Sequence, residues 1–136
     1  MKKVENILAY LARVITGLIL GLTIAATSSA ETLTVYTAVE AEDLKRYAAA
    51  FNEDHPGIKI RWVRDSTGIV TAKLLAEKNN PRADVIWGLA ATSLMLLKSE
   101  GMLQAYAPKG LNKLDSKFRD SANPPSWTGM DAWIAA

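Results

Sequence analysis

Apolar and polar positions follow two different spacings along the chain after residue 31, and the two spacings alternate. Residues 32–38 (TLTVYTA) alternate β-branched or aromatic side chains with smaller ones, which predicts a first strand. In the segment that follows, apolar residues have the spacing of one helix face, and the segment ends at an HPG sequence, residues 55–57. The apolar positions on that face are Leu44, Tyr47, Ala48 and Phe51.

The same pair of patterns repeats twice more. Residues 58–65 (IKIRWVRD) alternate and predict a second strand, and residues 84–88 (DVIWG) are short and apolar, as buried parallel strands are. A helical pattern follows each of these strands. The helix after the second strand turns Val70, Leu74 and Leu75 inward. The helix after the third strand ends at Gly101, and glycine is the residue type that most often closes helices. This order predicts an α/β fold with a mostly parallel sheet flanked by helices.

The last part of the chain carries a weaker pattern. The segment after Gly101 is rich in turn-forming residues and has no clear period, whereas residues 128–136 (TGMDAWIAA) resemble a further strand. The chain ends inside that strand pattern, so we expect an exposed strand edge there.

The first thirty residues differ in kind from the rest. Lys2 and Lys3 precede an apolar run at 14–26, and Ser28 and Ala30 have the spacing that a signal peptidase reads. These features predict a signal peptide at residues 1–30 and an exported chain at residues 31–136. The alternative is an uncleaved anchor, which needs roughly 20 apolar residues, more than the uninterrupted run provides.

Composition narrows the function of the exported part. Three of the 16 basic residues and one of the 14 acidic residues lie before residue 31, which leaves 13 of each. This near-neutral part has no basic stripe with interleaved aromatic residues, so nucleic acid is not an expected partner. The sequence has no cysteine and one histidine, and it lacks a nucleophile–base pair and metal-ligand spacing. We therefore expect neither an enzyme nor a cofactor or metal site.

Ligands of open α/β sheets bind where the carboxyl ends of the strands meet. The loop after the second predicted strand carries Ser66, Thr67 and Gly68 at the start of a helix. Two hydroxyls, a glycine and free helix N–H groups suit an anion. A Ser66 side chain that simply caps the helix explains the same residues.

Other positions near the predicted strand ends have two interpretations each. Tyr36 and Trp87 end the first and third strands, where they either line a pocket or pack the rim of the sheet. Glu40 suits the first turn of a helix as well as a ligand contact. Asp131 stands in an apolar stretch, where an unpaired buried carboxylate is costly, so it is either paired or functional.

Five stretches in this order carry a resemblance to a known family: VYTAVEAEDL, WVRDSTGIVTAKLLAEK, ADVIWGLAATSLMLL, GMLQAYAPKG and NPPSWTGMDAW. They resemble the periplasmic solute-binding proteins of ABC importers, in the branch of ferric-iron binders and most of all 2-aminoethylphosphonate binders. The resemblance implies a type II fold of two lobes. The exported residues would be part of the first lobe, with the second lobe absent from an apparently truncated chain.

The resemblance also implies a periplasmic monomer that delivers a small phosphonate to a permease in the inner membrane. Ferric iron or another small anion is the alternative ligand, and a remnant without ligand function is the alternative role. By position, the phosphonate oxygens would be held by Ser66, Thr67 and Gly68. The cleft would be lined by Tyr36, Thr37, Trp87 and Gly88. From charge complementarity, Glu40 or Asp131 would pair with the ammonium of the ligand.

Overall fold

The computed structural model describes residues 30–130 of the chain. Within this range three parallel strands, β1 (Glu31–Thr37), β2 (Ile58–Arg64) and β3 (Val85–Trp87), form one sheet in the order β2-β1-β3. The register pairs Thr37 of β1 with Arg64 on one side and with Trp87 on the other. The three strands therefore end in line, and the loops that follow them lie along one edge of the sheet.

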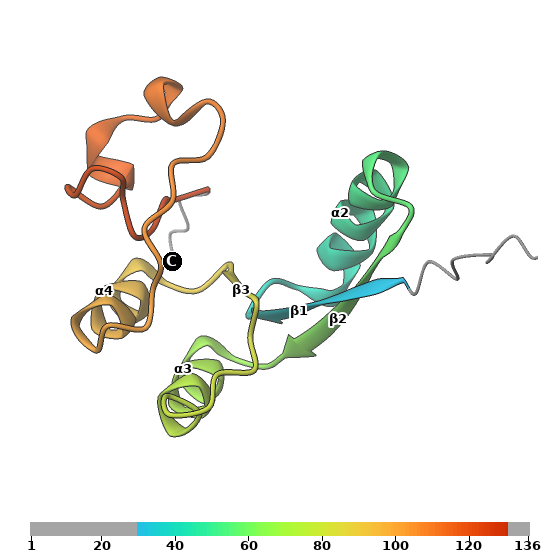
Figure 1. Ribbon diagram of the computed structural model, residues 1–136, viewed down its shortest axis with the longest axis horizontal. Coiled ribbons are helices and arrows are strands. Elements are labelled where there is room, and N and C mark those ends of the chain that lie inside the picture. Colours follow the sequence, from blue (N-terminus) through green and yellow to red (C-terminus); the bar gives the residue numbers. More distant parts are fainter. Residues whose placement is uncertain (1–29, 131–136) are drawn as a thin grey trace, which may run out of the picture.

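Each strand leads into a helix, as the alternation of patterns predicts. These are α2 (Ala41–Asp54), α3 (Thr67–Ala76) and α4 (Ala91–Ser99). Figure 1 shows α2 on one side of the sheet, and α3 and α4 on the other. The fold is thus an α/β sheet with helices on both faces, and all three helix N-termini lie at the carboxyl ends of the strands.

The main core lies between the sheet and the α3–α4 pair. Leu97 is fully buried, and the other members of this cluster are Tyr36, Val70, Leu74 and Leu89. The inward positions expected for α3 are confirmed, because Val70 and Leu74 are buried and Leu75 packs against the cluster.

The third strand is more exposed than its apolar sequence suggests. It pairs with β1 alone among the described residues, and its first residue, Val85, is 38% exposed. Its position at an edge of the three-stranded sheet explains the exposure, because no further strand within residues 30–130 pairs with its outer side.

The end of α4 confirms the helix-closing role of Gly101. This residue has a φ of 69°, and its N–H donates to the carbonyl of Lys98 at 2.9 Å. The N–H of Met102 donates to the carbonyl of Leu97 at 3.0 Å, which completes the paired bonds of a Schellman motif.

The segment after residue 103 has little regular structure. It contains two short 3₁₀ helices, η1 (Leu111–Lys113) and η2 (Ser116–Phe118), and runs beside α4, away from the sheet (Figure 1). Thr128 forms an isolated antiparallel bridge with Arg119 rather than part of a named strand. Residues 131–136 of the expected last strand, including Asp131, lie outside the described residues, as does nearly all of the expected signal peptide. No helix within residues 30–130 has the length and apolar character needed to cross a membrane.

Candidate functional site at the carboxyl edge of the sheet

Three loops meet where the strands end: residues 38–40 after β1, residues 65–66 after β2 and residues 88–90 after β3. We call this region the carboxyl edge. Thr37 lies at its centre, fully buried, and its Oγ1 accepts a hydrogen bond from the N–H of Val39 at 3.1 Å. The carbonyl of Thr37 accepts from the N–H of Asp65 at 3.2 Å, so one residue ties the first two loops together.

Gly88 brings the third loop against the first. Its φ of 69° lies in the left-handed region, and a β-carbon there would meet Cγ2 of Val39 at 2.1 Å. A residue with a side chain is therefore disfavoured twice, by backbone strain and by the methyl group of Val39, which would have to shift. The requirement for glycine at this position is structural, and it sets the spacing between two of the three loops.

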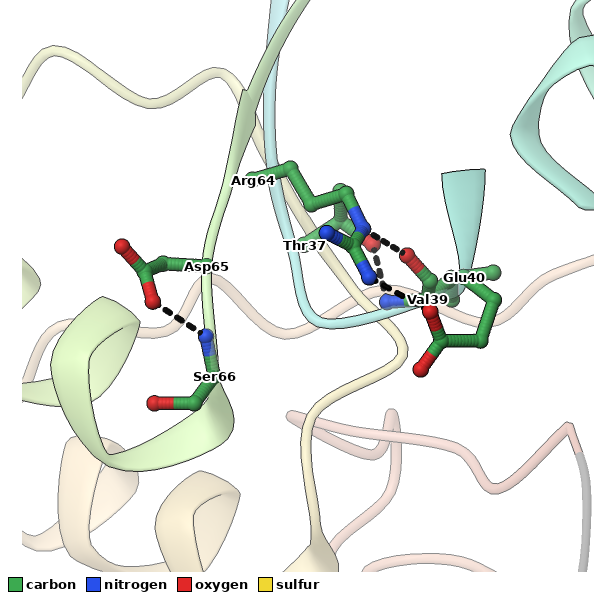
Figure 2. A network of polar contacts seen from close by, with 6 residues as sticks. All are labelled: Thr37, Val39, Glu40, Arg64, Asp65 and Ser66. Carbon is green, nitrogen blue, oxygen red and sulfur yellow. Dashed lines mark hydrogen bonds and ion pairs between the residues drawn. The ribbon is translucent and has the colours of Figure 1, made fainter. Parts of the chain in front are cut away.

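Arg64, the last residue of β2, holds the first loop from the other side (Figure 2). Its Nε donates to the carbonyl of Val39 at 2.7 Å, and its Nη2 lies 2.6 Å from Oε2 of Glu40. The Arg64 side chain is 38% exposed and that of Glu40 65%. The ion pair is thus open to solvent, and we expect it to contribute at most about 1 kcal/mol to stability. The sequence pattern did not single out Arg64, although its position at the end of a strand beside a candidate loop was a usable signal.

The N-terminus of α3 is the most open part of the carboxyl edge. Ser66 occupies the N-cap position, but its hydroxyl makes no capping hydrogen bond. Its N–H donates instead to Oδ1 of Asp65 at 2.7 Å (Figure 2). The first backbone bond of the helix runs from the N–H of Val70 to the carbonyl of Ser66 at 3.0 Å. The N–H groups of the first turn, at residues 67–69, therefore have no partner inside the helix.

Two features make this first turn accessible. Ser66 and Gly68 are exposed, and a β-carbon at Gly68 would meet no atom within 4 Å. Free N–H groups and the positive end of the helix dipole favour a negatively charged group at such a place. The other two helices that start at this edge also lack a side-chain cap, with Glu40 and Ala90 at their N-cap positions. Geometry and electrostatics at the carboxyl edge thus suit an anion.

Tyr36 lies apart from these loops. It is 2% exposed and belongs to the core, and its hydroxyl donates to Oε2 of Glu77 just after α3 at 2.8 Å. Burial is the main cause that raises the pKa of Tyr36 above its ordinary value, and the hydrogen bond to the Glu77 carboxylate is the next. Of the two interpretations of this residue, the packed one describes its position in the structure.

Trp87 packs on the opposite face of the sheet, in an aromatic cluster that the sequence pattern did not reveal. Its ring lies edge-on to Tyr47 at 4.8 Å and tilted against Trp62 at 5.7 Å between centroids. Its indole N–H also contacts the sulfur of Met130. Trp87 is half-buried, so this cluster fixes its position beside Gly88 without covering it fully.

A cavity of about 220 Å³ lies between the C-terminal ends of α3 and α4 and the segment that leads into β3. Its lining includes Leu74, Ile86 and Met102, with Glu77 and Arg82 beside them. None of the residues expected to bind the ligand lines it. Within residues 30–130, no group of three or more histidine, cysteine, aspartate or glutamate residues is arranged to hold a metal ion.

A family model and one named relative indicate the same family. Residues 37–135 match the family model described as bacterial extracellular solute-binding protein. A probable ABC transporter periplasmic-binding protein of Sinorhizobium fredii, y4fP, is 36% identical over 92 residues, which are 68% of this chain and 25% of that protein. An uncharacterized protein of Haemophilus influenzae is 33% identical over 54% of this chain and 21% of its own length.

Solved structures give the same picture. The periplasmic binding protein AfuA from Actinobacillus pleuropneumoniae, with exogenous fructose-6-phosphate bound, aligns with a TM-score of 0.61 at 28% identity over 74% of this chain and 30% of AfuA. Iron-bound HitA from Pseudomonas aeruginosa aligns with a TM-score of 0.60 at 25% identity over 67% of this chain and 29% of HitA. The aligned part of the chain thus spans 25% of y4fP and under a third of AfuA and of HitA.

Proposed function

Because the chain belongs to the family of bacterial extracellular solute-binding proteins, we propose that it serves as the solute-binding component of an ABC importer. In this proposal, residues 1–30 are a signal peptide that directs export. Residues 31–136 are then a part of the first lobe of a two-lobed, type II periplasmic binding protein. The protein acts as a periplasmic monomer and hands its ligand to a permease in the inner membrane. The similarity to y4fP and AfuA supports this role.

The proposed ligand is a small phosphonate, and 2-aminoethylphosphonate is our first candidate. The observation that carries this choice is the uncapped first turn of α3 at the carboxyl edge. A phosphonate offers three oxygen atoms that accept hydrogen bonds, and the turn offers free N–H groups and two hydroxyls. The structure of AfuA with a sugar phosphate supports a ligand of related charge.

The residues take different parts in this proposal. Ser66, Thr67 and Gly68 hold the phosphonate oxygens, and Gly68 lets the ligand approach the backbone. Thr37 and Gly88 shape the wall beside the ligand, through the contacts that order Val39. Two further expected cleft residues have supporting positions: Trp87 backs the wall through its aromatic cluster, and Tyr36 supports β1 from the core.

Ferric iron is the second candidate ligand, and the similarity to iron-bound HitA is the observation that favours it. Iron binding calls for several oxygen or nitrogen ligands around one point. Phosphonate binding calls for hydrogen-bond donors, which the carboxyl edge supplies. The two candidates therefore make different demands on the same edge and can be separated by titration.

The test is a titration of the full chain followed by amide NMR, a method that detects binding even at millimolar dissociation constants. The probes are 2-aminoethylphosphonate, fructose-6-phosphate, inorganic phosphate and ferric citrate. We expect 2-aminoethylphosphonate to shift the amide signals of residues 66–69 in a saturable way. A response to ferric citrate, together with none to the phosphonate, would replace the proposed ligand by iron. No response to any phosphonate or phosphate would refute the anion site.

A further inference from the structure

Two carboxylates stand in the loops of the carboxyl edge among the described residues, and their surroundings differ. Glu40 follows β1 and Asp65 follows β2, whereas the segment after β3, residues 88–93, has no charged side chain. The one basic residue at the end of a strand here is Arg64. Two more carboxylates, Glu42 and Asp43, lie in the first turn of α2, and Asp43 pairs with Arg46. The local charge beside α3 therefore depends on which of the two loop carboxylates the guanidinium of Arg64 contacts.

Arg64 pairs with Glu40 and not with its own neighbour Asp65. Successive side chains of a strand point to opposite faces, so Arg64 and Asp65 turn away from each other. Figure 2 shows the guanidinium beside Val39 and Glu40, with the Asp65 carboxylate on the other side of the chain. Glu40 is therefore compensated by a cation 2.6 Å away.

Asp65 keeps its negative charge without such a partner. Within residues 30–130 no lysine or arginine lies within ion-pair distance of its carboxylate, which accepts a hydrogen bond from the N–H of Ser66 at 2.7 Å. The residue is exposed and directly precedes the first turn of α3. An anion held by the N–H groups of that turn would therefore lie close to the negatively charged carboxylate of Asp65.

This arrangement has opposite effects on two kinds of ligand. A simple anion is repelled by Asp65, whereas a ligand with a cationic group next to its anion gains an ion pair with it. We infer that Asp65 selects zwitterionic ligands, such as aminoalkylphosphonates, and that Arg64 supports this selection by neutralising Glu40. The inference rests on the proposed function and names the charge pattern of its ligand.

A simpler role for Asp65 is to stabilise the start of α3 as a negative charge near a helix N-terminus. That role concerns stability and does not depend on the ligand. A ligand pair that differs only in the ammonium group separates the two roles. Such a pair is 2-aminoethylphosphonate and ethylphosphonate.

The experiment compares the full chain with Asp65→Asn and follows both ligands by amide NMR. Asparagine keeps an oxygen that accepts the Ser66 N–H, so the variant changes charge more than shape. Exposed ion pairs of this kind change affinity roughly two- to fivefold. We expect Asp65→Asn to weaken 2-aminoethylphosphonate binding by that factor and to tighten ethylphosphonate binding. Asp54→Asn, at the far end of α2, is the matched control and is expected to leave both affinities as they are.

Glu40→Gln tests the other carboxylate. It releases the guanidinium of Arg64, so both phosphonates should bind somewhat more tightly, without a change in preference. If Glu40→Gln instead removes the preference for the amino ligand, the ammonium pairs with Glu40 and the inference is wrong. It is also wrong if Asp65→Asn moves both ligands in the same direction. If the wild-type chain responds to neither phosphonate, the proposed function itself is wrong. If it binds both phosphonates equally, the selection by Asp65 is wrong and the proposed function stands.

Discussion

The γ2 methyl group of Val39 lies so close to Gly88 that a β-carbon at position 88 would come within 2.1 Å of it. This contact joins the loop after β1 to the loop after β3 across the end of the sheet. The loop after β2 joins the loop after β1 through Arg64 and through the N–H of Asp65. The carboxyl edge is thus a fixed arrangement of three loops, held by contacts that involve few side chains.

We predict that Gly88→Ala destabilises the protein by about 2–5 kcal/mol. A left-handed backbone costs a residue with a β-carbon about 1–2 kcal/mol, and overpacking adds about 1–3 kcal/mol. The measurement is the free energy of unfolding from urea titration. Gly68→Ala is the control, because a β-carbon there has open space in a helix, and its stability should stay level or rise.

A double variant separates the two causes at Gly88. Adding Val39→Ala removes the methyl group that clashes but leaves the backbone strain, since φ remains 69°. We expect part of the lost stability to return, down to a remaining loss of about 1–2 kcal/mol. Equal stabilities of the Gly88→Ala single and double variants would show that the clash contributes nothing.

The second prediction concerns Thr67, in the first turn of α3. Thr67→Asp places a carboxylate where we propose that the phosphonate binds, so phosphonate binding should be lost. The same charge at a helix N-terminus favours the helix by about 0.3–1 kcal/mol, so the fold should be at least as stable as before. Calorimetry and thermal unfolding measure the two effects on one sample.

Thr67→Asn is the matched control for this variant, because it has nearly the same shape as aspartate without its charge. It should retain most of the binding that Thr67→Asp loses. If both variants bind as the wild type does, the first turn of α3 is not the phosphonate site.

The third prediction concerns Tyr36, which the structure places in the core. Tyr36→Phe removes the hydroxyl that donates to Glu77 at 2.8 Å, and hydrogen bonds to charged groups contribute about 1.5–3 kcal/mol. Glu77 also pairs with Lys73 at 2.9 Å, so we expect a loss near the lower end, about 1.5 kcal/mol. Urea unfolding measures it, with Tyr106→Phe as the control, because Tyr106 is 70% exposed. A phosphonate affinity that falls with no loss of stability would place Tyr36 in the cleft instead.

Much of the fold could be predicted from the sequence, because its periods are local. The alternation in β1 and β2, the inward positions of α3 and the glycine at the end of α4 each depend on residues close in the chain. They are confirmed within one or two residues. The α/β class followed from their order alone.

The contacts across the sheet could not be predicted in the same way. Arg64 contacts Glu40, and Trp87 packs on Tyr47 and Trp62, because the strand order is β2-β1-β3. No local pattern encodes that order. The sequence also left the role of Ser66 open between a cap and an anion contact, and only the rotamer of its hydroxyl in the folded chain shows that it does not cap α3.

The last prediction concerns Asp120, which attaches the irregular C-terminal segment to α4. The ammonium of Lys98 lies 2.6 Å from its Oδ1, and the N–H of Ser126 donates to its Oδ2 at 2.9 Å. These bonds lower the pKa of Asp120 from its ordinary value of 3.8 to about 2, and the bond with Lys98 has the largest effect. The folded state therefore favours the ionised form. Its contribution to stability is complete above pH 3.8 and is lost as the pH falls toward 2.

Asp120→Asn should accordingly lower the Tm at pH 7 by roughly 5 °C, and the difference from the wild type should shrink between pH 4 and pH 2. Thermal unfolding at several pH values measures this. The control is Asp115→Asn, which removes a carboxylate that is 56% exposed and lies 3.5 Å from Lys117, and whose effect should be small. A Tm difference for Asp120→Asn that stays constant over this range would mean that its bonds to Lys98 and Ser126 do not depend on the charge. The attachment of the segment to α4 would then rest on shape and neutral hydrogen bonds.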